Sequence, residues 1–145
     1  MTGSRAIGWM LCLCVVASAC ASVRTRRTDL RDAIHSYNVA IRWGHIQKAS
    51  MYIPAAKRAN FVARKRAALA HMRIHEVHLR NVAVATDQSA AKVLLQVAFS
   101  VGADPIIRNH LVEQKWRFVD GQWLLISKRQ VKKVRRDASS PSDLY

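Results

Sequence analysis

The sequence predicts an α+β domain in which three helices pack on one face of a four-stranded antiparallel sheet. Residues 28–72 place apolar side chains at helical spacing, whereas residues 77–131 alternate apolar and polar side chains. Between two alternating segments stands Asp120-Gly121, a dipeptide that tolerates the positive φ angles of a two-residue hairpin turn. An amphipathic helical layer and a half-apolar sheet must cover each other.

The first helix is expected to begin at Thr28, a suitable N-cap, and to end at Gly44, which supplies a left-handed residue. Its apolar stripe consists of Leu30, Ile34, Tyr37 and Ile41. A short second helix is expected over residues 45–53, and a third over residues 55–72. The apolar face of the third helix is interrupted by Lys65.

The clearest strand is a period-two row formed by Ala91, Val93, Leu95, Val97, Phe99 and Val101. Before it, Val77 and Leu79 alternate out of phase with Val82 and Val84. This phase change predicts either a β-bulge near residues 80–81 or two separate strand pieces.

The hairpin register follows by counting outward from its turn. The count places four side chains on one buried face: Trp116, Phe118, Trp123 and Leu125. It also pairs Gln114 with Ser127 and Lys115 with Ile126. The opposite face carries basic side chains and is expected to meet water.

At 145 residues and 50% hydrophobic content, the chain is long enough for one domain with one core. The formal net charge is +15, which favours anionic partners.

The N-terminus predicts export. Arg5 precedes an apolar run over residues 6–16, and Ala17-Ser18-Ala19 is the small-residue pattern of a signal-peptidase site. The apolar run is shorter than the roughly 20 residues that a membrane-spanning helix needs.

Cys20 follows this site directly, and the segment VVASAC resembles the lipobox of bacterial lipoproteins. That resemblance implies a diacylglyceryl thioether and fatty acyl chains such as palmitate on Cys20, although Ala17 stands where leucine is most common. Ordinary signal peptidase would instead release a soluble periplasmic or secreted domain. Removal of residues 1–19 leaves Cys20 as the single cysteine, so no intramolecular disulfide can form.

The expected layout is a signal peptide (1–19), a tether after the lipidated cysteine (20–27), one domain (28–134) and a disordered tail (135–145). Because aspartate does not follow Cys20, the resemblance favours an outer-membrane lipoprotein facing the periplasm.

The order of elements, the segment KASMYI and the pattern W-x-x-x-D-G-x-W together resemble the nuclear transport factor two-like, or cystatin-like cone, superfamily. The resemblance spans about residues 28–131. It implies a cone fold, in which a curved sheet wraps around the first helix and leaves a conical pocket. Many members bind ligands or partners without catalysis, and this superfamily often dimerises through the open sheet face.

Five residues are candidates for lining such a pocket: Tyr37, Tyr52, His110, Gln114 and Trp116. We expect a non-catalytic domain that binds a small apolar ligand or an envelope protein, with no cofactor. The alternative is a periplasmic isomerase or dehydratase, in which His110 and Tyr37 transfer a proton. The scarcity of carboxylates outside turns and helix ends disfavours this alternative.

Three histidines, His71, His75 and His78, suggest a metal site at first sight. The segment HEVH is not the HExxH motif, and on a strand His75 and His78 would point to opposite faces. No metal is therefore expected.

The basic residues of the C-terminal part form a run that is expected to contact anionic lipid or lipopolysaccharide: Lys128, Arg129, Lys132, Lys133, Arg135 and Arg136. In an exported protein this membrane contact is favoured over nucleic acid, which would be the partner in the cytoplasm.

Overall fold

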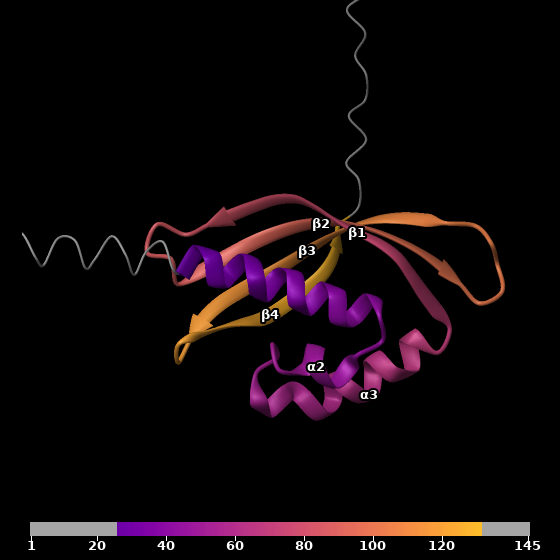
Figure 1. The fold of residues 1–145 in the computed structure, drawn as a ribbon, viewed down its shortest axis with the longest axis horizontal. Helices are drawn as coiled ribbons and strands as arrows, with labels where there is room; N and C mark the ends of the chain where they lie inside the picture. Colours follow the sequence, from indigo (N-terminus) through magenta and orange to yellow (C-terminus); the bar gives the residue numbers. More distant parts are fainter. Residues whose placement is uncertain (1–25, 132–145) are drawn as a thin grey trace, which may run out of the picture.

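A computed structural model describes residues 26–131, which form a four-stranded sheet with the helices on one of its faces (Figure 1). The elements are the first helix (26–42), α2 (Ile46–Ser50), the 3-10 turn η1 (Ala55–Lys57), α3 (Arg58–Leu69), β1 (Met72–Val84), β2 (Ala90–Val101), β3 (Arg108–Val119) and β4 (Gln122–Val131). The predicted signal peptide, Cys20, residues 21–25 and the C-terminal tail lie outside the described residues. The same holds for Lys132, Lys133, Arg135 and Arg136.

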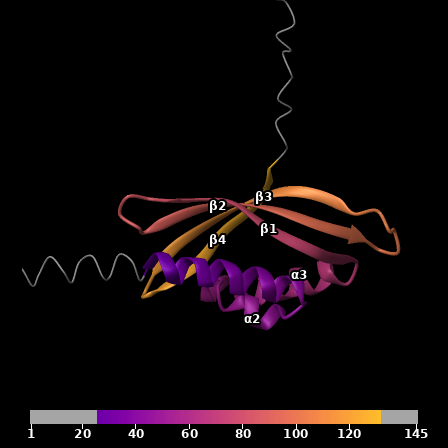
Figure 2. The ribbon, with the colours of Figure 1, turned by 45° about the horizontal axis from the view of Figure 1, so that its top comes forward.

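The strands form an antiparallel meander in the order β1-β2-β3-β4, so the predicted fold class is confirmed. The sheet curves over the helical layer, and its inner face is the one that the helices cover (Figure 2). Within residues 26–131, none of the helices combines the length and the hydropathy needed to cross a bilayer.

The first helix includes residues 26 and 27, so Thr28 lies inside it and the predicted start is wrong. Tertiary contacts explain the added residues. The indole Nε1 of Trp123 donates a hydrogen bond to the Arg26 carbonyl at 3.1 Å, and the Arg26 guanidinium lies 4.7 Å from the centre of the Phe118 ring. Gly44, with φ of 73°, ends the helix as predicted.

The core lies between this helix and the inner sheet face. The first helix contributes the predicted stripe of Leu30, Ile34, Tyr37 and Ile41, and the sheet contributes Val93, Leu95, Trp116, Trp123 and Leu125, all buried. Burial at about 25 cal/mol per Å² of apolar surface makes this contact the main stabilising one.

The hairpin turn is as predicted, with φ angles of 49° at Asp120 and 81° at Gly121. Next to the turn the predicted pairs of Phe118 with Trp123 and of Trp116 with Leu125 are also confirmed.

Farther from the turn the predicted register is wrong, because Ile126 is an extra residue that forms a β-bulge. Gln114 pairs with Lys128 instead of Ser127, and Lys115 pairs with Ser127 instead of Ile126. The backbone N–H of Leu125 donates instead to the carbonyl of Tyr52 at 2.7 Å, which attaches the turn after α2 to the bulged strand.

In β1 the predicted bulge is confirmed between Leu79 and Asn81. A second bulge at His75 was not expected. It leaves His75 bonded to Ser100 at 2.9 Å, while His78 pairs with Gln96. Both partners are outer-face residues of β2, so the expected opposite orientation of these histidines is wrong.

Candidate functional site

Three of the predicted pocket residues form one aromatic cluster under the sheet. The ring of Tyr37 lies 5.8 Å from that of Trp116 and 6.4 Å from that of Tyr52, in both cases edge to face. Tyr37 and Trp116 are almost completely buried. The cluster joins the first helix, the turn after α2 and β3.

Gln114 belongs to a buried chain of hydrogen bonds beside this cluster. The Trp116 Nε1 donates to Gln114 Oε1 at 3.0 Å, and Gln114 Nε2 donates to Asn38 Oδ1 at 2.9 Å. The chain ends at the carbonyl of Ile34, 2.7 Å from Asn38 Nδ2. Because their polar groups already have partners, Gln114 and Trp116 hold the core together and are not free to bind a ligand.

His110 lies apart from the other four candidates. It sits near the start of β3, where its ring packs edge to face on Phe99 with 4.7 Å between ring centres. It does not line the cavity described next. The structure therefore does not bring His110 together with Tyr37.

A cavity of about 510 Å³ opens between α3 and the inner side of β4. Its wall includes the apolar side chains of Tyr37, Ile53, Phe61, Ala68, Val112 and Leu125, and the cations Lys57, Arg64, Lys65, Lys128 and Arg129. No carboxylate appears among the described residues that line it. The cavity is thus apolar inside, cationic around its opening and within the size range of small-molecule sites.

A groove of similar size, about 550 Å³, lies between the first helix and the strands β1 and β2. Its lining contains Asp32 next to Arg31 and Arg42, so acidic and basic groups are mixed there. The cavity under β4 differs in carrying cations alone together with a buried polar atom that lacks a partner. For this reason we take it as the candidate site.

That polar atom is the hydroxyl of Tyr37. Within the described part of the chain it has no hydrogen-bond partner, and the residue is 0% exposed. Burial raises the pKa of Tyr37 above its ordinary value, so the phenol stays protonated and can donate a hydrogen bond. A buried hydroxyl without a partner costs about 1 to 3 kcal/mol.

Lys65 and Lys128 face this cavity from α3 and β4. Burial lowers the pKa of Lys65, and the nearby charge of Arg64 lowers it further. Burial also lowers the pKa of Lys128 to about 8, with a further contribution from the charge of Lys65. Lys128 is nevertheless exposed to water, because a concave wall can crowd an ammonium group without closing over it. The lowered pKa values of Lys65 and Lys128 mean that their charged forms are disfavoured when the cavity holds no anion.

Lys128 faces the cavity because of the bulge at Ile126. With regular pairing through Ile126 it would point outward from the sheet, where the basic run is expected to contact anionic lipid. The next residue, Arg129, lies on the outer face and pairs with Glu113 at 2.9 Å. The hydrogen bond from Arg129 lowers the pKa of that carboxyl. The described part of the basic run is therefore divided between two faces.

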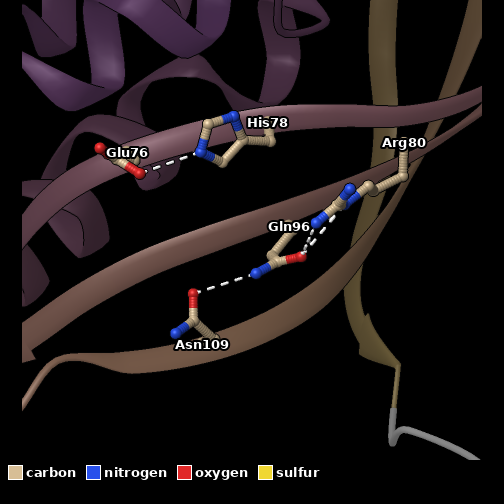
Figure 3. A network of polar contacts seen from close by, with 5 residues as sticks. All are labelled: Glu76, His78, Arg80, Gln96 and Asn109. Atoms are coloured by element: carbon tan, nitrogen blue, oxygen red, sulfur yellow. Dashed lines mark hydrogen bonds and ion pairs between the residues drawn. The ribbon is translucent and has the colours of Figure 1, made fainter.

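The outer face carries a network of polar contacts (Figure 3). The Arg80 guanidinium donates to Gln96 Oε1. The Gln96 amide nitrogen Nε2 in turn donates to Asn109 Oδ1 at 3.2 Å. Beside them His78 lies 2.9 Å from Glu76. Among residues 26–131 no group of three or more histidine, cysteine or acidic side chains is arranged to hold a metal ion.

No protein-family model and no curated protein sequence matches the chain. Solved structures do match in fold. A SEC-C motif containing protein from Rhodopseudomonas palustris aligns with a TM-score of 0.59 at 15% identity, over 69% of this chain and 77% of that one.

Two further structures give similar values. A protein of unknown function with a cystatin-like fold from Nostoc punctiforme aligns with a TM-score of 0.55 at 10% identity, covering 72% of this chain and 88% of that one. An NTF2-like protein from Cytophaga hutchinsonii aligns with a TM-score of 0.56 at 11% identity, covering 72% and 96%. The domain therefore has the cone fold of the NTF2-like and cystatin-like proteins.

Proposed function

We propose that the chain is a lipid-anchored cell-envelope protein whose cone domain binds a small ligand without transforming it. The cavity under β4 is the observation that carries the binding function, because apolar side chains and cations line the same space of about 510 Å³. The anchor follows from the lipobox resemblance at Cys20, and the expected location is the periplasmic face of the outer membrane.

The basic residues near the C-terminus support contact with the anchoring membrane. Each cation near an anionic surface contributes about 1 kcal/mol, so the four basic residues of 132–136 would hold the domain close to lipid headgroups or lipopolysaccharide. The proposal gives no role to nucleic acid. An envelope protein or a second copy of the chain remains the other candidate partner.

An isomerase or dehydratase would need a proton-transfer group in the cavity. The carboxylates of the described residues do not line it, and His110 lies elsewhere. These positions favour the binding function over the enzyme.

The anchor is tested by the intact mass of the protein isolated from its own membranes. A chain that starts at Cys20 and carries acyl mass is expected. An unmodified start at Cys20, or a chain that retains Met1, would refute the anchor.

The binding function is tested by mass spectrometry of small molecules that co-purify with the protein. Filling the cavity with Val112→Trp should abolish co-purification. Leu111→Trp, one residue along the same strand on its outer face, is the matched control and should retain the ligand. Equal recovery from both variants would place the ligand elsewhere.

A further inference from the structure

Of the cations that line the cavity, Arg129 pairs with Glu113, whereas Lys57, Arg64, Lys65 and Lys128 form no ion pair within the described residues. Like charges that converge beside a partly desolvating wall repel one another, which disfavours this arrangement when the cavity holds no anion. A bound anion would relieve that repulsion.

The apolar part of the cavity wall is unsuited to a fully polar ligand. Phe61 and Val112 present buried apolar surface, and Leu125 continues it along β4. Such surface gains free energy when it covers an apolar chain rather than water.

We infer that the ligand is a single-chain anionic amphiphile, with its acidic headgroup between Lys65 and Lys128 and its apolar chain against Phe61 and Val112. This inference rests on the proposed binding function and adds the chemical class of the ligand. A free fatty acid and an acidic lipid within a bilayer share this chemistry, so the experiment must separate the two sources.

The test is a set of calorimetric titrations at pH 7 with the full chain carrying Cys20→Ser, so that no covalent acyl chain competes for the cavity. The probes are oleate, oleyl alcohol and inorganic phosphate, each below the concentration at which it aggregates. Oleate should bind about tenfold or more tightly than oleyl alcohol, the size of effect expected when a charge-assisted contact is present or absent. Inorganic phosphate should not displace oleate.

The variant Lys65→Met with Lys128→Met should weaken oleate binding to the level of oleyl alcohol while leaving oleyl alcohol unchanged. Lys92→Met with Lys115→Met, on the exposed outer face, is the matched control and should change neither. Thermal unfolding of both double variants checks that each is folded.

Equal affinity of oleate and oleyl alcohol would overturn the anionic headgroup and leave the proposed binding function standing. Absence of binding by both would count against the binding function as well. Displacement of oleate by inorganic phosphate would show that the site binds anions in general, and it would overturn the contact with an apolar chain. The fourth outcome concerns membranes. The protein could float with phosphatidylglycerol vesicles only when Lys65 and Lys128 are present, while oleate does not bind. That result would assign both lysines to contact with a bilayer surface and would overturn the inference of a free amphiphile as ligand.

Discussion

The two faces of the sheet place their cations in different surroundings. On the outer face, Arg129 lies beside Glu113 and Arg80 beside Gln96, while Lys92 and Lys115 are exposed to water and form no ion pair within the described residues. On the inner face, the buried amides form a closed chain of hydrogen bonds, yet Lys65 and Lys128 have no ion-pair partner within residues 26–131. The cations of the inner face therefore differ from those of the outer face in lining a cavity together with apolar side chains.

The largest expected effect comes from breaking the inner chain of hydrogen bonds. Gln114→Leu keeps the side-chain size but leaves the Trp116 indole N–H and the Asn38 amide oxygen without their partner, both in the core. Unfolding by urea should show a loss of about 2 to 4 kcal/mol. A loss below about 1 kcal/mol would mean that this chain is not a stabilising contact.

At Tyr37, a substitution is expected to leave the free energy of unfolding unchanged or to raise it. Tyr37→Phe removes a buried hydroxyl that has no partner among the described residues, so the free energy of unfolding should stay the same or rise by about 1 kcal/mol. Lower stability would show that the hydroxyl already has a partner, and Tyr52→Phe serves as a comparison within the same aromatic cluster.

The pH dependence of the free energy of unfolding should reveal the surroundings of the inner-face groups Lys128 and Tyr37. The pKa of Lys128 is about 8 in the folded protein, below its ordinary value, so between that pH and about 10.5 the unfolded chain binds more protons. The contribution of Lys128 to stability therefore rises with pH across this window. The pKa of Tyr37 is raised instead, and its contribution falls above about pH 10.

The contribution of Lys128 is measured as the difference between the wild type and Lys128→Met in urea unfolding from pH 7 to 10. The variant should be the more stable at pH 7, and the difference should shrink as pH rises. Lys115→Met should show no such pH-dependent difference. An identical pH profile for the wild type and Lys128→Met would contradict the lowered pKa.

The smallest effect is expected on the outer face. Glu113→Gln removes the partner of Arg129, but water can hydrate both groups, so the urea midpoint should stay within the error of the measurement. A clear loss would show that the outer face also depends on its charge pairs.

The fold could be predicted from the sequence because its signals are local and periodic. The alternation along β2, the apolar stripe of the first helix and the Asp120-Gly121 turn each specify one element. Packing two apolar layers then leaves few architectures.

The candidate site could be predicted only in part. The cone-fold resemblance groups Tyr37, Tyr52 and Trp116 as pocket candidates, but the position of Lys128 depends on an extra residue in β4, for which period-two counting gives no signal. Lys65 was visible as a cation on an apolar helical face. That interruption of the pattern was the available indication that α3 borders a cavity.

The bulge at Ile126 also has a consequence for divergence within this fold. If Ile126 paired regularly with Lys115 and did not bulge, Lys128 and Arg129 would exchange orientations, so that a guanidinium would replace an ammonium at the cavity while Lys128 turned to solvent. A shift of the strand register by one residue, with no substitution at all, would thus replace a point-like cation by a planar, forked donor at the cavity wall.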